Sequence, residues 1–240
     1  MEKTSPEKEE ERVEYHYRLG ECYIKLEKIN EAVLEHYSKA LESYQKQPQR
    51  HTKKILEINE KMGRIYETCK QYALAFQHYS QALEIKRSIY PAEDEEILTS
   101  LKVVAQIEYN TGHFRQAAEL FGEALHIHKA LSGYNQAPTA DLYHSLALSL
   151  FHVQQYALWL DYHHEAFKIM RELELTGTAE FNHYLGTFME NLDELVIRAD
   201  YDHELALKAV GVLTLMHSGQ QQADFIDRIS DIISKKNTNP

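Results

Sequence analysis

Apolar residues recur at intervals of three and four along most of the chain, which is the spacing that gathers them on one face of an α-helix. No region alternates apolar and polar residues in the manner of a half-buried strand. Helix-breaking residues are scarce, with 9 Gly and 5 Pro, and the chain is rich in strong helix formers. The pattern therefore predicts an all-α protein.

The helical pattern also repeats with a fixed period of 42 residues. Its clearest markers are alanines and aromatic residues one period apart: Ala40, Ala82, Ala124 and Ala166, together with Tyr72, Phe114 and Tyr156. A period of roughly 20 to 50 residues is typical of solenoids, in which each unit packs only on its neighbours. We therefore expect a stack of similar units.

Each unit reads as two helices joined by a short turn. Small residues stand where the helices must approach closely, with Gly63 and Ala105 on first helices and Ala117 on a second helix. The three aromatic markers are expected to open the second helices. Gly112 is expected to end a first helix in a left-handed turn, a conformation that glycine adopts at little cost.

The stretch GHFRQAAELFGEAL, residues 112–125, places its glycine, aromatic and alanine residues at offsets that resemble the tetratricopeptide repeat. The resemblance extends from Val13 to about Leu173, and the 42-residue unit is similar to the subtype found in kinesin light chains. It implies a right-handed superhelix of stacked antiparallel helix pairs, a tetratricopeptide-like solenoid. In such a fold the first helices line a concave groove.

The repeat pattern divides the chain into four parts. Residues 1–11 are predicted to be a disordered acidic tail, and residues 12–173 are predicted to form four helical-hairpin repeats. Residues 174–236 are expected to hold a degenerate fifth repeat and C-terminal capping helices, because an amphipathic run near Phe225 suits the sealing of an open end. Residues 237–240 are predicted to be a disordered tail.

Charge and composition exclude several classes of function. The net charge of −11, with 26 Lys and Arg spread among 37 Asp and Glu, argues against nucleic acid as a partner. The apolar stretch from Leu205 to Met216 is too short to span a bilayer, and no signal or transit peptide is evident. Cys22 and Cys69 cannot form a disulfide framework and are expected to be small buried packing residues. We therefore expect a cytoplasmic protein.

The residue types used in catalysis do not gather into a motif. Although the chain has 14 His, no two of them lie three or four residues apart on a helix. The Glu-x-x-His pairs Glu123–His126 and Glu180–His183 fall in different repeats. Nucleophile motifs and phosphate-binding glycine loops are absent, and Trp159 occupies a small-residue position with an expected structural role. We predict no enzyme activity, no metal and no cofactor.

The outward side chains of the first helices are the candidates for partner binding. They change along the chain from charged to aromatic, apolar and His-rich; Phe151 or Leu148 packs in the core or, if the two are exposed, they form an anchor pocket for a partner beside His144. At Tyr109 a rotation of the helix by one residue stays open, because Glu108 holds the place of the family's aromatic residue. The candidates are Arg64, Lys102, Gln106, Tyr109, Asn110, His144, Ser145, Phe151, His152 and His183.

Two functions fit this surface. The first is a non-enzymatic module that binds a peptide or helical segment of a partner protein in its concave groove. The second is a peptide-sensing regulator, because VEYHYRLGECYIKLEK, residues 13–28, resembles the first repeats of bacterial Rap-type proteins. Those proteins carry a further N-terminal helical bundle, and only about 12 residues precede the first repeat here. Homo-oligomer formation is compatible with both.

Overall fold

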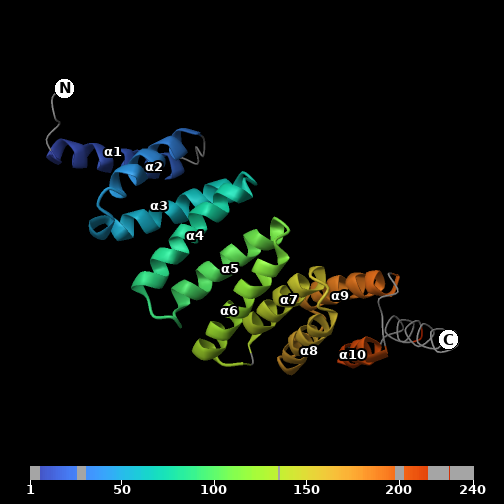
Figure 1. The fold of residues 1–240 in the computed structure, drawn as a ribbon. Coiled ribbons are helices and arrows are strands. Elements are labelled where there is room, and N and C mark those ends of the chain that lie inside the picture. Colours follow the sequence, from blue (N-terminus) through green and yellow to red (C-terminus); the bar gives the residue numbers. More distant parts are fainter. Residues whose placement is uncertain (1–5, 26–30, 135, 198–202, 216–226, 228–240) are drawn as a thin grey trace. The chain divides into compact units, whose positions relative to one another are not determined.

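The computed structural model describes residues 6–25, 31–134, 136–197, 203–215 and 227, and within these ranges the regular structure is entirely α-helical (Figure 1). This confirms the predicted fold class of paired, stacked helices. The chain divides into two compact units, unit 1 at Met1–Thr111 and unit 2 at Gly112–Pro240. In the part of the chain that the structure describes, no helix is both long enough and apolar enough to cross a membrane.

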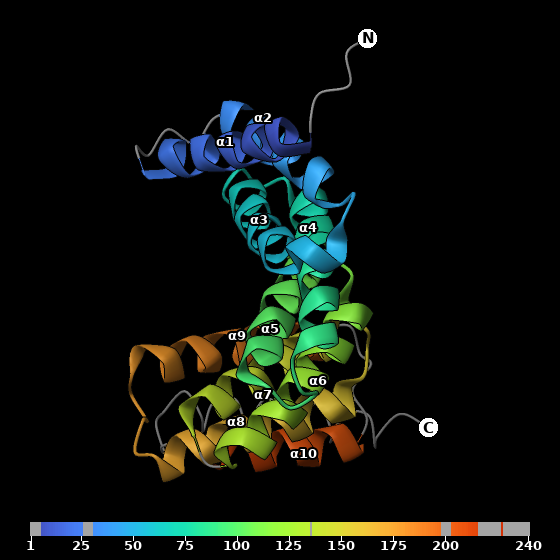
Figure 2. The ribbon, with the colours of Figure 1, turned by 90° about the vertical axis from the view of Figure 1, so that its left-hand side faces the viewer.

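Unit 1 holds two helical hairpins and the first helix of a third (Figures 1 and 2). Helix α1 packs on α2, α3 on α4, and α4 on α5. Asp94 caps α5, because its carboxylate accepts a hydrogen bond of 2.8 Å from the backbone N–H of Glu96. The helices are α1 (Pro6–Lys25), α2 (Glu31–Tyr44), α3 (Pro48–Thr68), α4 (Tyr72–Ile89) and α5 (Glu95–Asn110).

Unit 2 begins with the second helix of that third repeat. Helix α7 packs between α6 and α8, and α10 lies against α8, as both ribbon views show (Figures 1 and 2). Its helices are α6 (Phe114–Ser132), α7 (Ala137–His152), α8 (Tyr156–Glu172), α9 (Ala179–Ile197) and α10 (His203–Leu213). The predicted aromatic openings are confirmed, because α4, α6 and α8 begin at the three residues that share the 42-residue spacing.

The turn within each hairpin repeats together with the helices. Gly112 has a backbone φ of +84°, which confirms the predicted left-handed turn. One period away on either side, Lys70 and Gln154 adopt the same conformation with φ of 58° and 62°. The repeat therefore fixes the turn geometry even where the residue is not glycine, because the packing of the two helices determines the path between them.

Glycines on first helices mark the closest helix approaches. A methyl group added to Gly63 would lie 2.8 Å from the ring of Tyr79, and one added to Gly20 would lie 2.6 Å from the ring of Tyr37. These two pairs occupy matching positions in the first and second repeats. They confirm that the small residues are there because an aromatic ring of the second helix lies directly against the first helix.

We expect Gly63→Ala to destabilise the protein by about 1 kcal/mol. Overpacking against Tyr79 costs about 1 to 3 kcal/mol and outweighs the gain of about 1 kcal/mol in helix propensity. Gly122→Ala is the matched control, because no atom lies within 4 Å of its added methyl group. Gly122→Ala is expected to stabilise by about 0.5 to 1 kcal/mol in urea unfolding. Equal shifts for the two variants would contradict the packing explanation.

The ends of the chain differ from the expectation in one respect. Helix α1 begins at Pro6, so residues 6–11 belong to a helix where a disordered tail was predicted. The expected tail at 237–240 and most of the expected capping run lie outside the described residues. Helices α9 and α10 occupy the region of the degenerate fifth repeat.

The two cysteines were expected to be buried, and this expectation was wrong. Both Cys22 and Cys69 are exposed free thiols. Cys22 lies on the outward side of α1, and Cys69 follows the last residue of α3 at its C-cap. A small residue in a helical segment therefore did not indicate the core at either position.

Candidate interaction surfaces

The first helices α1 and α3 of unit 1 are joined by a charged network. Lys61 of α3 donates to Glu21 of α1 at 2.5 Å and to Glu57, one helical turn away, at 2.8 Å. Glu21 also accepts a hydrogen bond of 2.5 Å from the hydroxyl of Tyr37. Burial lowers the pKa of Lys61, but the two carboxylates outweigh this effect and raise its pKa above the ordinary value. The ammonium group is therefore held by the protein itself.

A buried tyrosine completes this network. The ring of Tyr17 lies under the ammonium of Lys54, with 3.6 Å from the nitrogen to the ring centroid. Burial, followed by a hydrogen bond to Glu57, raises the pKa of the Tyr17 phenol. Tyr17, Glu57 and Lys54 thus serve the contact between α1 and α3. Since these side chains contact one another, they are less available to a partner protein.

Lys86 links α3 to α5 from the second helix α4. Its ammonium lies 2.6 Å from Glu60 and 2.8 Å from Glu96, and its side chain is only 5% exposed. Burial lowers the pKa of Lys86, but the two carboxylates outweigh it and raise the pKa. Since a buried cation is stable only when it is paired, both carboxylates are committed to the structure.

Beyond its first turn, where Glu96 pairs with Lys86, helix α5 carries exposed polar side chains for which the structure shows no ion pair among the described residues. Lys102, Gln106 and Asn110 are exposed at intervals of four residues, so they form one row, and Tyr109 beside them is half-buried. Gln106 donates to Asn110 at 3.0 Å, whereas Lys102 has no ion pair within the described part of the chain. We call Lys102, Gln106 and Asn110 the α5 row. Arg64 of α3 is also exposed.

In unit 2 the expected exposure of two candidates was wrong. Phe151 is 4% exposed and His144 is 5% exposed, so neither side chain is a surface anchor in this structure. The ring of Phe151 contacts Trp159 at a centroid distance of 5.1 Å, and the ring of His144 stacks on Tyr184 at 3.9 Å. The ring of Phe151 packs against α8, that of His144 lies between α8 and α9, and the packing alternative for Phe151 is the correct one.

The physical reason is a rotation of α7 away from the expected stripe. The outward positions are Asp141, Ser145, Leu148 and His152, of which Asp141 and His152 are exposed and the other two are half-buried. Asp141 accepts a hydrogen bond from the hydroxyl of Tyr184. Because α7 carries apolar residues on most of its circumference, its apolar pattern does not define which side faces outward.

Two further candidates lie at the surface of unit 2. The ring of His152 stacks on Phe114 at the start of α6, with centroids 3.9 Å apart. His183 of α9 is exposed, and its ring lies 5.8 Å from that of His144. The structure therefore brings His144 and His183 together, whereas the candidates of unit 1 lie on α3 and α5.

A buried histidine pair is the feature of unit 2 that the sequence did not reveal. His163 of α8 is fully buried, its ring lies 5.2 Å from that of His144, and no ring nitrogen of either has a hydrogen-bond partner among the described residues. Burial lowers the pKa of His144 to about 3 and that of His163 well below its usual range. Both imidazoles are therefore neutral.

No group of three or more His, Cys, Asp or Glu in the described ranges is arranged to hold a metal ion. The buried histidine pair consequently has two imidazoles but no third ligand of these types in position. The burial of His163 could have been predicted by aligning the repeats with one another. His163 stands at the position that Phe121 and Tyr79 occupy in the preceding repeats. An aromatic packing role for the His163 ring follows from this comparison.

Comparison with known proteins agrees with this architecture. The family model of the tetratricopeptide repeat matches residues 54–130. A search of curated proteins found no match. Among solved structures, the chain is similar to the nearly identical TPR-like repeats of a Podosopora anserina kinesin light chain, with 15% identity and a TM-score of 0.55 over 95% of this chain and 98% of that one.

Two other solved structures are similar across most of the chain. BtubC from P. vanneervenii has 17% identity and a TM-score of 0.50, covering 97% of this chain and 91% of that chain. The apo form of RapI has 14% identity and a TM-score of 0.51, covering 94% and 85%. At these identities the likeness establishes the fold. Residues 54–130 match the tetratricopeptide repeat family, and the fold of the chain is similar to that of the TPR-like repeats of a kinesin light chain.

Proposed function

We propose that the chain is a non-enzymatic interaction module that binds an extended or helical segment of a partner protein on the outward face of its first helices. The observation that carries this proposal is the contrast between α5 and its neighbours in unit 1. Charged groups on α1 and α3 are paired with each other, whereas Lys102 has no ion pair among the described residues. A cation without an intramolecular partner can pair with a partner's carboxylate without first breaking an existing ion pair.

The α5 row suggests the chemistry of the bound segment. Lys102 offers a cation to an acidic side chain of the partner. The amides of Gln106 and Asn110 each have donors and acceptors that can bond the backbone of an extended peptide. Tyr109 supplies an aromatic edge that is half-buried. We therefore propose a segment with an acidic residue close to an apolar one.

The candidate residues of unit 2 divide into accessible ones, which can contact a partner, and buried ones, which cannot. Ser145, His152 and His183 have a side accessible to solvent, and they stay candidates for contact with a partner. His144 and Phe151 support these residues from inside the unit. We propose that they act on binding only through the position of α7.

Partner capture with matched variants tests the proposal. Wild-type chain, Lys102→Glu and Gln77→Glu are immobilised, and the bound proteins are quantified from the lysate of the encoding organism. Gln77 is exposed on the second helix α4, so its variant carries an added negative charge away from the α5 row. We expect Lys102→Glu to lose about tenfold or more of a specific partner, and Gln77→Glu to retain it. Equal retention by both variants would remove the support for this face.

The second candidate function, a peptide-sensing regulator, rests on the resemblance of residues 13–28 to Rap-type proteins and on the similarity of the fold to RapI. It differs in requiring only a short peptide. Small-angle scattering with the captured partner and with synthetic peptides from it separates the two. Compaction on addition of a peptide alone favours the sensor, and a requirement for the folded partner favours the interaction module.

A further inference from the structure

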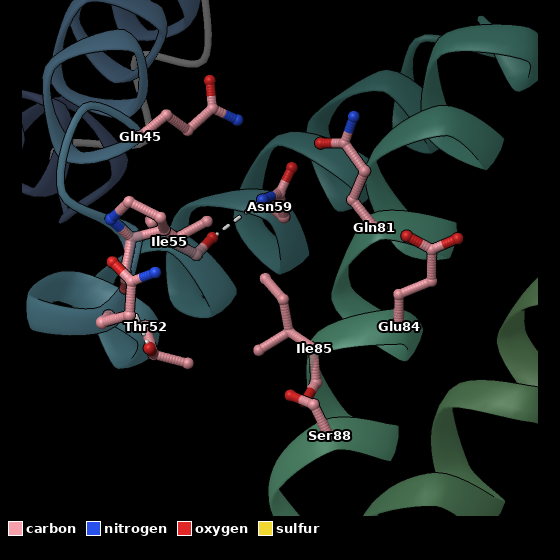
Figure 3. Close-up of a pocket in the computed structure, with 10 residues that line it drawn as sticks. Gln45, Thr52, Ile55, Asn59, Gln81, Glu84, Ile85 and Ser88 are labelled. Carbon is pink, nitrogen blue, oxygen red and sulfur yellow. Dashed lines mark hydrogen bonds between the residues drawn. The ribbon is translucent and has the colours of Figure 1, made fainter.

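A hollow of about 370 Å³ opens in unit 1 between the end of α2, the beginning of α3 and the second half of α4 (Figure 3). We call it the unit 1 pocket. Its apolar part consists of Ile55 and Ile85, which face each other from α3 and α4. The backbone of α3 leaves helical geometry at His51, so the first turn of the helix bends at the mouth of the pocket. The volume lies near the lower end of the range for ligand sites, about 300 to 1,000 Å³.

Some of the polar side chains around the pocket bond to the protein itself. Asn59 donates to the carbonyl of Ile55 at 2.9 Å, and its carbonyl oxygen lies 2.8 Å from Nδ1 of His78. Thr52 donates to the carbonyl of Pro48 at 2.9 Å. These groups form a wall whose hydrogen bonds are already satisfied. They are not the groups that would recognise a ligand.

The remaining polar lining groups are free to accept hydrogen bonds. The lining includes four further polar side chains that have no hydrogen bond or ion pair with another described residue: Gln45, Gln49, Gln81 and Glu84. Glu84 is the single charged residue of the lining, and its exposed side chain lies on α4 at the rim of the pocket, one helical turn from Gln81 (Figure 3). The pocket therefore combines an apolar surface formed by Ile55 and Ile85 with one carboxylate and three side-chain amides.

The corresponding junction in unit 2 carries a cationic side chain of the protein itself. Two repeats after Gln45 and Asn59, the chain has Lys129 and Tyr143. The ammonium of Lys129 donates to the hydroxyl of Tyr143 at 2.6 Å and lies 5.0 Å from the ring centroid of Tyr134. A long cationic side chain thus fills the junction in unit 2. Neutral, smaller residues replace these two residues in unit 1.

We propose that the unit 1 pocket binds an arginine side chain presented by an extended segment of a protein partner. The aliphatic stem packs on Ile55 and Ile85, as long cationic side chains do on apolar surfaces. The guanidinium has five donors in a planar fork, which suits the Glu84 carboxylate at the rim of the pocket. None of the pocket's lining residues is among the first-helix candidates, so this binding is independent of the proposed function.

The test uses the full chain with ¹³C-labelled isoleucine δ1 methyl groups. The probe is acetyl-Ala-Arg-Ala amide, and its neutral match is the same peptide with citrulline in place of arginine. We expect the methyl signals of Ile55 and Ile85 to shift in a saturable manner with the arginine peptide, about tenfold more tightly than with the citrulline peptide. Both methyl groups are placed in the apolar part of the pocket, so their signals report on the site directly.

Two variants make the result decisive. Glu84→Gln keeps the size of an exposed side chain and removes its charge, and we expect it to abolish the preference for arginine over citrulline. Glu119→Gln removes an exposed carboxylate from α6 and is expected to leave the preference unchanged. Absence of shifts at both methyl groups, equal binding of the two peptides, or an unchanged preference in Glu84→Gln would each overturn the proposal.

Discussion

Acidification from neutral pH to pH 5 is expected to lower the free energy of unfolding of unit 2 by about 2 kcal/mol through the buried His144, with a further loss in the same direction through His163. His144 and His163 both have pKa values that burial depresses below the ordinary value of 6.5. Their neighbours are aromatic rings and the exposed His183, and none of the four ring nitrogens has a hydrogen-bond partner among the described residues. A proton on either ring would therefore be a poorly compensated buried charge.

The sign follows from which state binds the protons. In the unfolded chain both imidazoles take up a proton as the pH falls through about 6.5, whereas in the folded unit they stay neutral down to about pH 3 for His144 and to well below 6.5 for His163. The stabilisation is thus fully present above pH 6.5. It declines by about 1.4 kcal/mol per pH unit for each histidine below that value.

A substitution separates this effect from the titration of other groups. His163→Phe places the residue that the preceding repeat has at Phe121, so the ring is accommodated in an aromatic environment. We expect this variant to lose less stability than the wild type between pH 7 and pH 5, because it lacks one of the two buried imidazoles. His183→Gln, at an exposed position, is expected to follow the wild type. Urea unfolding followed by circular dichroism at several pH values measures the difference, and identical pH profiles for all three proteins would refute the assignment.

Replacement of Trp159 by alanine is expected to destabilise unit 2 by about 3 to 5 kcal/mol, the cost typical of a large aromatic residue removed from a core. Trp159 is fully buried, and its ring lies 5.2 Å from Phe188 of α9 and 5.1 Å from Phe151 of α7. It therefore joins three helices. Alanine would leave a cavity lined by the rings of Phe151 and Phe188. Because these rings belong to two different helices, they cannot both move to fill it.

The neighbouring Leu158 provides the control for this prediction. Its side chain is 44% exposed on the same helix, so Leu158→Ala is expected to change the free energy of unfolding by no more than about 0.5 kcal/mol. Far-UV circular dichroism is the suitable signal, because Trp159 is the single tryptophan of the chain. A loss below 1 kcal/mol in Trp159→Ala would show that the ring does not organise the unit.

Much of the fold was predictable because the repeat leaves several independent marks in the sequence. The aromatic residues that open α4, α6 and α8, the left-handed turn at Gly112 and the close approach at Gly63 all follow from the 42-residue register. Each of these is a local requirement of backbone geometry or of helix packing. Such requirements restrict the residue type strongly, so a single sequence is sufficient to reveal them.

The sites were less predictable because they depend on which side of a helix faces outward. On α7, the expected stripe through His144 and Phe151 and the observed one through Ser145 and His152 share Asp141 and Leu148, so their mean directions differ by about 50°. Apolar residues on both stripes make the two alternatives equally consistent with the sequence. The ion pair between Lys61 and Glu21 joins two different helices. Because the residues lie forty positions apart, no local spacing in the sequence predicts their contact.

Site-specific photo-crosslinking tests the proposed function most directly. A photoreactive residue is placed at Gln106 in the α5 row, or at Gln77 on the second helix α4, and covalent adducts are identified after irradiation with the lysate of the encoding organism. The proposed mode of binding predicts an adduct with another protein from position 106 and little from position 77. An adduct from position 77 without one from position 106 would contradict it.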